Sequence, residues 1–181
     1  MGLFSSCFLK EDNEMIELPI GTIRKLVRNY LQKDIPSKLG YLEGIENCSV
    51  PDVDICTDVL MYAELRGNNQ GIVKLLSNAL KDNPNAEAIS VTHESSVSAK
   101  VNGGQRIGIC VVSRAVDIAI NKAAKRKIGI VGCSNYSSAT GAIGYWARKI
   151  AKSGNIAIVM SQCNELVAPH GSYEPIFGTN P

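Results

Sequence analysis

Hydrogen-bonding side chains gather in one short stretch of this 181-residue sequence, residues 133–138, which reads Cys-Ser-Asn-Tyr-Ser-Ser. An apolar run, residues 128–131, precedes it, and residues 141–152 follow with helical spacing of apolar positions. Loops at strand ends often carry ligand-binding groups, because rigid elements hold them in place. The Ser, Asn and Tyr side chains, with the N–H groups that begin the next helix, could bind a carboxylate or a phosphate. The alternative is that Ser138 or Thr140 only caps that helix.

The segments around this loop have the pattern of a strand–helix–strand unit. Residues 128–131 and 155–160 are short apolar runs next to glycine, which is typical of buried strands. Residues 141–152 carry one apolar stripe at helical spacing: Ile143, Trp146, Ala147 and Ile150. We therefore expect two inner strands, with the polar loop at the end of the first.

The first half of the chain predicts three helices. Residues 21–33 have one apolar face and end before Pro36: Ile23, Leu26, Val27, Tyr30 and Leu31. A second helix opens at Pro51 and ends by Gly67, with a buried face of five residues: Val53, Cys56, Val59, Leu60 and Ala63. A third follows Asn69 and ends before Pro84. These helices predict a small helical lobe over residues 15–84.

The apolar period changes after residue 84. Residues 88–92 and 97–101 have the pattern of strands, with a turn at residues 102–104, and residues 109–123 again have helical spacing. Hairpin and crossover connections in one domain predict a mixed sheet. The fold class is therefore α/β, with a small N-terminal helical lobe followed by a mixed α/β domain, residues 85–181.

The composition is that of an ordinary soluble globular protein, with 45% hydrophobic residues, 20% charged residues and a formal net charge of +2. The basic run at residues 122–127 fits a solvated helix end better than a nucleic-acid site. We expect a cytoplasmic protein, because no signal peptide and no apolar run of ~18 residues is present. The six cysteines form no C-x-x-C pair and there are two histidines, so we expect free thiols and no metal site.

The first seven residues fit the acceptor pattern for N-myristoylation, with Gly2 as acceptor and Cys7 placed for a second acyl chain. Two chains would anchor the protein at a membrane, whereas one would bind only marginally. We expect residues 1–14 to be an appended extension, and membrane association only if this terminus is acylated.

Neither G-x-G-x-x-G after a strand nor a P-loop motif occurs. The order of the motifs nevertheless resembles the type-2 malate/L-lactate dehydrogenase family, whose relatives include ureidoglycolate and sulfolactate dehydrogenases. The resemblance covers residues 15–181 and rests on four stretches: residues 65–74, 131–151, 160–169 and 178–181. The last of these, Gly-Thr-Asn-Pro, is the most specific.

This resemblance implies an NAD- or NADP-dependent oxidoreductase that acts on a small 2-hydroxy or 2-keto acid. It also implies a cofactor domain unlike the Rossmann fold, and a homodimer. Family members continue well beyond the Gly-Thr-Asn-Pro motif, so we expect a domain truncated at Pro181. Such an enzyme needs a proton donor for the substrate oxygen and a cation or hydrogen-bond donors for the substrate carboxylate.

The resemblance places the catalytic candidates by position. The family's Ser-His pair falls on Asn69 and Gln70, its following arginine on Lys74, and its loop histidine on Tyr136. Asn69 is thereby a candidate substrate contact. Gln70 could orient a substrate oxygen, and Lys74 could hold the carboxylate. Tyr136 could donate a proton, helped by a nearby cation such as Lys74. The alternatives are that Lys74 is a solvated helix residue and Tyr136 a packed loop aromatic.

The resemblance also supplies ligand contacts. Two residues match a turn at the floor of the substrate site: Thr179 and Asn180. Seven residues match loops that contact the cofactor in the family: Ser134, Asn135, Ser137, Ser138, Ser161, Gln162 and Cys163. Three interpretations stay open: part of an active dehydrogenase, an inactive member that binds a dinucleotide or a partner, or a structural fragment without independent function.

Overall fold

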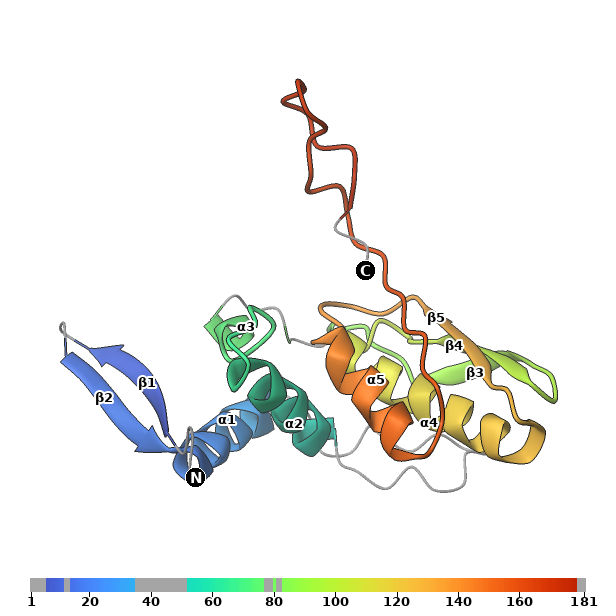
Figure 1. Cartoon of the computed structure of the whole chain (residues 1–181), viewed down its shortest axis with the longest axis horizontal. Coiled ribbons are helices and arrows are strands. Elements are labelled where there is room, and N and C mark those ends of the chain that lie inside the picture. The colour runs from blue at the N-terminus through green and yellow to red at the C-terminus, as the bar shows by residue number, and fades with distance from the viewer. Residues whose placement is uncertain (1–5, 12–13, 35–51, 77–79, 81–82, 179–181) are drawn as a thin grey trace. The chain divides into compact units, whose positions relative to one another are not determined.

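A computed structural model describes residues 6–11, 14–34, 52–76, 80 and 83–178 (Figure 1). By backbone contacts, residues 1–142 form one compact unit and residues 143–181 another. The predicted boundaries at residues 14 and 84 stay predictions. Among the described residues, none of the helices has the length and apolar character that a membrane crossing requires.

The first described element is a two-stranded antiparallel hairpin. Strand β1 (Ser6–Glu11) pairs with β2 (Glu14–Pro19), with Ser6 opposite Pro19 and Glu11 opposite Glu14. The hairpin was not predicted, because the two strands lack the alternating pattern and the Asn-Gly or Asp-Gly turn by which hairpins are recognised. It joins part of the expected extension to the residues before the first helix.

The predicted helices follow. Helix α1 (Ile20–Asp34) buries Ile23, Val27 and Leu31, while Leu26 and Tyr30 of the predicted face are about half exposed. Only the residues spaced four apart, Ile23, Val27 and Leu31, therefore pack into the core. Two arginines of α1, Arg24 and Arg28, form ion pairs with Asp58 and Asp54 of α2.

Helix α2 (Asp52–Glu64) buries all five residues of its predicted apolar face. Helix α3 spans Val73–Leu76, four residues of the longer helix that was predicted there. Residues 77–79 and 81–82 of that predicted helix lie outside the described residues.

A three-stranded mixed sheet confirms the predicted fold class. Strand β4 (Ser98–Asn102) lies between β3 (Ser90–Glu94), its antiparallel neighbour, and β5 (Ile130–Ser134), its parallel neighbour. Each strand begins one or two residues later than predicted. The expectation that residues 128–131 form a buried strand was wrong in one respect, since Ile128 and Ile130 are more than half exposed.

Helix α4 (Gly108–Arg126) connects the two parallel strands and packs along both of them (Figure 1). Fully buried apolar side chains in residues 1–142 come mainly from α2, β4 and the start of α4: Val59, Leu60, Val101, Ile107, Ile109 and Val111. Val111 is buried beside Ile109 and Cys110, because the first turns of this helix are covered on nearly all sides.

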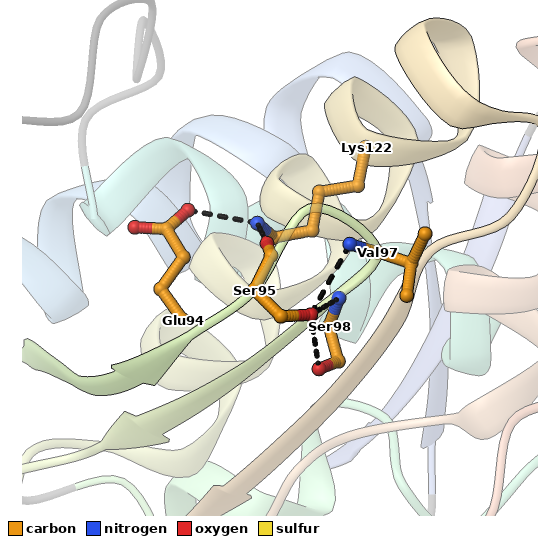
Figure 2. A network of polar contacts seen from close by, with 5 residues as sticks. All are labelled: Glu94, Ser95, Val97, Ser98 and Lys122. Carbon is orange, nitrogen blue, oxygen red and sulfur yellow. Dashed lines mark hydrogen bonds and ion pairs between the residues drawn. The ribbon is translucent and has the colours of Figure 1, made fainter.

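Figure 2 shows how the turn between β3 and β4 is held. The Ser95 hydroxyl accepts the backbone N–H groups of Val97 and Ser98 at 3.2 and 2.9 Å. Lys122 of α4 donates to the Glu94 carboxylate at 2.8 Å and to the Ser95 carbonyl at 2.7 Å. Lys122 is therefore buried, which corrects the expectation that the whole run 122–127 is solvated, whereas Lys125, Arg126 and Lys127 are exposed.

In residues 143–181, helix α5 (Ile143–Lys152) confirms the predicted helix and buries Trp146. The predicted strand at residues 155–160 was wrong, because this segment pairs with no strand among the described residues. Its apolar side chains Ile156, Ile158 and Met160 are 98%, 83% and 80% exposed. An apolar pattern predicts burial, but a strand forms only where another strand accepts its backbone hydrogen bonds.

Candidate functional site

The polar loop after β5 lies against the segment that follows β4. The two strands are parallel neighbours, so the segments that leave their carboxyl ends meet at one edge of the sheet. Gly103 N–H donates to the Ser134 carbonyl and Gln105 N–H to the Asn135 carbonyl, both at 2.8 Å. Ser137 continues the pairing: its N–H donates to the Arg106 carbonyl at 2.9 Å. Backbone hydrogen bonds therefore fix the course of the candidate loop.

Asn135 is a structural centre of this loop. Its backbone has a left-handed φ of 56°, a conformation that asparagine tolerates better than most residues. Its side-chain N–H donates to the Asn102 side-chain oxygen at 2.7 Å, and its own oxygen accepts from the Gln105 amide. The Asn102 oxygen also accepts the N–H of Gly104 at 3.1 Å. Asn135 was predicted as a cofactor ligand, and in the structure its side-chain hydrogen bonds hold the two segments together.

Tyr136 is half-buried and packs against a glycine. A Cβ atom placed on Gly103 would lie 2.8 Å from the Tyr136 Cβ and 2.9 Å from the Asn135 carbonyl oxygen, closer than real Cβ contacts come. Only glycine therefore lets the two segments approach this closely. Both segments belong to residues 1–142, so this packing is internal to one compact unit.

Burial raises the pKa of the Tyr136 hydroxyl above its ordinary value, and the nearby Cys133 raises it further. Burial also raises the pKa of the Cys133 thiol. The pKa of Tyr136 is therefore shifted opposite to the direction in which a neighbouring cation would move it. Its phenol stays protonated at neutral pH and is a proton donor rather than a base.

The serines of the loop divide into two kinds. Ser134 and Ser138 are exposed residues. Ser137 is half-buried and forms a bridge with Ile107. Helix α5 begins at Ile143, so neither Ser138 nor Thr140 directly precedes it, and the capping alternative stays open.

The second candidate region, residues 66–74, is a compact turn after α2 that runs into α3, where Lys74 lies. The Asn68 side-chain oxygen accepts the Gln70 N–H at 2.9 Å, and the Glu64 carboxylate accepts the Ile72 N–H at 2.9 Å. Gln70 and Lys74 are half-buried, and Asn69 is exposed. The roles of these three residues stay predictions.

A buried charge cluster beside α4 was not predicted from the sequence. The Asp52 carboxylate lies 2.9 Å from the Arg114 guanidinium and 3.7 Å from that of Arg106, and the exposed fractions of these side chains are 9%, 4% and 3%. Because the Arg106 carbonyl accepts the Ser137 N–H, the cluster adjoins the candidate loop through the backbone. Its three members lie up to 62 residues apart, so no local pattern could reveal it.

The remaining predicted site residues are the ligands in residues 143–181 and the two acylation candidates near the N-terminus. Ser161 is half-buried, while Gln162 and Cys163 are exposed. Thr179, Asn180 and Gly2 fall outside the described ranges, and Cys7 lies on β1. Within the described part of the chain, no three His, Cys, Asp or Glu side chains gather closely enough to bind a metal ion.

Two solved structures to which this chain is similar are dehydrogenases. The malate dehydrogenase of Pyrococcus horikoshii OT3 superposes with a TM-score of 0.73 at 32% identity, covering 92% of this chain and 45% of that one. The sulfolactate dehydrogenase of Methanocaldococcus jannaschii gives 0.70 at 28% identity, covering 90% and 45%. The fold is therefore of a dehydrogenase class.

The sequence defines the class more closely. The family model of malate/L-lactate dehydrogenase matches residues 45–181. The chain is 37% identical to the malate dehydrogenase of Pyrococcus abyssi over 138 residues, covering 72% of this chain and 37% of that protein. It is 32% identical to the L-sulfolactate dehydrogenase of Methanothermobacter thermautotrophicus over 133 residues, covering 71% and 39%. The chain belongs to the malate/L-lactate dehydrogenase family, which confirms the resemblance, and it spans about two fifths of these relatives' length.

Proposed function

We propose that this chain provides part of an NAD- or NADP-dependent oxidoreductase that acts on a small 2-hydroxy or 2-keto acid. The observation that carries the proposal is the loop at residues 134–138, where Tyr136 is protonated, half-buried and held at a sheet edge. The named relatives, which are malate and sulfolactate dehydrogenases, support this substrate class. A homodimer and a cytoplasmic location are part of the same proposal, whereas acylation at Gly2 or Cys7 is left as a prediction.

The residues present fit a nicotinamide dinucleotide and an acid substrate. The hydroxyls of the exposed residues Ser134 and Ser138 can donate hydrogen bonds to phosphate, ribose or amide oxygens. A bound nicotinamide supplies hydride exchange with the carbon of a carbonyl or alcohol. The chain must hold the ligand, exclude water and manage one proton, and the loop can contribute to each of these tasks.

Tyr136 donates the proton in this proposal. As a carbonyl is reduced, its oxygen becomes strongly basic, and a nearby phenol can transfer a proton to it. Because burial raises the pKa of Tyr136, the phenol is a poor base at neutral pH. We therefore expect keto-acid reduction to be faster than the reverse oxidation near pH 7. Lys74 would attract the substrate carboxylate, and the amide of Gln70 would orient a substrate oxygen.

A second candidate function is an inactive family member that still binds a dinucleotide or a protein partner. Gln70 and Tyr136 occupy the positions where the resemblance places the family's two histidines. Glutamine exchanges no proton, and the pKa of Tyr136 is raised away from neutrality. Binding would survive these replacements even if turnover did not.

The test uses the chain alone and a chimera in which residues 45–181 replace the matching part of the Pyrococcus abyssi malate dehydrogenase. NADH and NADPH are titrated while nicotinamide fluorescence is followed, and oxaloacetate, pyruvate and sulfopyruvate are assayed as substrates. We expect weak or no binding by the chain alone, and binding with turnover by the chimera. Tyr136→Phe should lower kcat of the chimera by about 10²–10⁴-fold with cofactor affinity unchanged.

Tyr173→Phe is the matched control, because Tyr173 is 92% exposed. It should leave kcat unchanged. A folded chimera that binds NADH without turnover would favour the inactive alternative. Turnover that survives Tyr136→Phe would remove Tyr136 from the mechanism. A folded chimera that binds neither dinucleotide would refute the proposed function.

A further inference from the structure

Two thiols face each other where α2 packs against α4. The sulfur atoms of Cys56 and Cys110 are 3.7 Å apart, and the two residues are 0% and 3% exposed. The ion pair of Asp52 with Arg114 lies four residues away along each helix, in opposite chain directions. The helices therefore run antiparallel along this contact, and the ion pair fixes their register one turn from the thiols.

The two thiols are in direct contact, as disulfide formation requires. A sulfur–sulfur bond is about 2.05 Å long, so the two atoms would have to approach by about 1.7 Å. Rotation about the first side-chain torsion moves a cysteine sulfur through a distance of this order without any backbone shift. Cys56 and Cys110 need no other residue to be displaced from between them, because they already form a hydrogen-bonded pair.

The surroundings protect the pair while the helices stay packed. The hydrogen bond shared with Cys56 and burial raise the pKa of the Cys110 thiol, Asp52 raises it further, and Arg114 acts in the opposite direction. The reactive thiolate is therefore scarce while α2 and α4 stay packed together. Reaction would take place during folding or when α2 briefly separates from α4.

We propose that Cys56 and Cys110 form a reversible disulfide that cross-links α2 to α4, with a low-molecular-weight disulfide such as oxidised glutathione as oxidant. One cysteine thiolate attacks a glutathione sulfur, breaks that sulfur–sulfur bond and releases one glutathione thiol. The second cysteine then displaces the other glutathione from the mixed disulfide. The two protein thiols are oxidised, the glutathione disulfide is reduced to two thiols, and the two protein protons end on glutathione.

Such a bond would link α2 to α4, the helix that follows the segment supporting the candidate loop. Residues 103–107, which hold Asn135 and Ser137, lead directly into α4, and Cys110 lies in the first turn of α4. The cross-link would therefore limit the separation of α2 from the segment that supports the loop. The inference depends on the thiol geometry alone and stands whether or not the chain takes part in dehydrogenation.

The experiment measures the equilibrium of the pair in glutathione buffers. The background variant carries Cys7→Ser, Cys48→Ser, Cys133→Ser and Cys163→Ser, so that only the two facing thiols remain. It is refolded in buffers of graded reduced and oxidised glutathione, quenched with an alkylating agent and analysed by intact mass and peptide mapping. We expect an intrachain 56–110 disulfide and a rise in Tm of several degrees that dithiothreitol reverses.

If the proposal is right, the native structure must stabilise the disulfide more than the unfolded chain does. Reducing the native disulfide should therefore need at least a tenfold more reducing buffer than reducing it in 6 M guanidinium. In the matched control, with Cys110→Ser added, Cys56 should form only a mixed disulfide with glutathione. If the background variant does not fold, peptide mapping of the unsubstituted chain measures the same equilibrium. Equal or easier reduction in the native state would overturn the proposal.

Discussion

Removal of the buried carboxylate at Asp52 should destabilise the protein strongly. Asp52→Asn keeps the size of the side chain but deletes a negative charge that lies 2.9 Å from Arg114 and 3.7 Å from Arg106. Both arginines are at least 96% buried, so their positive charges would stay inside the protein with weaker compensation. An uncompensated buried charge is among the few single changes with large effects.

The size of the effect follows from burial. Breaking a buried ion pair by removing one partner costs about 3–5 kcal/mol of the free energy of unfolding. Other contacts of the two arginines reduce this figure, so the lower end is expected. For a protein of this length each kcal/mol lowers Tm by about 2–4 °C, which gives a fall of roughly 10 °C.

The assay is urea or thermal unfolding followed by circular dichroism, with Asp54→Asn as the control. Asp54 also lies in the first turn of α2 and also pairs with an arginine, at 2.6 Å, so both variants lose the same helix-dipole contribution. The Arg28 partner of Asp54 is 43% exposed, and water screens such a pair, so the control should change Tm far less. Equal destabilisation by the two substitutions would refute the reasoning from burial.

The remaining predictions concern the candidate loop. Gly103→Ala should destabilise the protein by about 1–3 kcal/mol in urea unfolding, because its Cβ would collide with Tyr136 and Asn135, whereas Gly132→Ala, with nothing within 4 Å of its Cβ, should have little effect. Similar losses for both would contradict the close approach. Since burial raises the folded-state pKa of Tyr136, its contribution to stability is fully present below pH 10 and is lost as pH rises through the raised pKa. Tm measured from pH 8 to pH 12 should therefore fall more steeply above pH 10 for the wild type than for Tyr136→Phe, and parallel curves would show that this tyrosine is not shifted.

The sequence predicted those parts of the fold that local patterns determine. Helices α1, α2, α4 and α5 follow from apolar residues repeated every three or four positions, because one helix carries the whole signal. The mixed sheet followed from two kinds of connection between short strands. The hairpin of β1 and β2 was missed and the strand at residues 155–160 was wrongly assigned, since pairing depends on a second segment that no local pattern names.

The sequence pointed to a polar loop as the candidate site, but not to the residues that hold this loop. The polar loop and Tyr136 were found because hydroxyl and amide groups stand out after an apolar strand. The residues that position them, Gly103 and Gln105, lie 30 or more residues earlier in the chain and have no unusual spacing of their own. Asn135 was predicted as a ligand, yet its side chain serves the loop. Residue type alone does not distinguish an amide side chain that binds a ligand from one that holds a turn.

The groups that hold the loop determine how the candidate site responds to pH. The contacts that hold the loop join the amides of Asn102, Gln105 and Asn135 and backbone groups, none of which titrates. The raised pKa values of Tyr136 and Cys133 place their ionisation above their ordinary ranges. From pH 5 to pH 8 neither the loop's hydrogen bonds nor its proton donor should therefore change state. A pH-dependent rate in that range would have to come from the substrate, or from groups outside the loop.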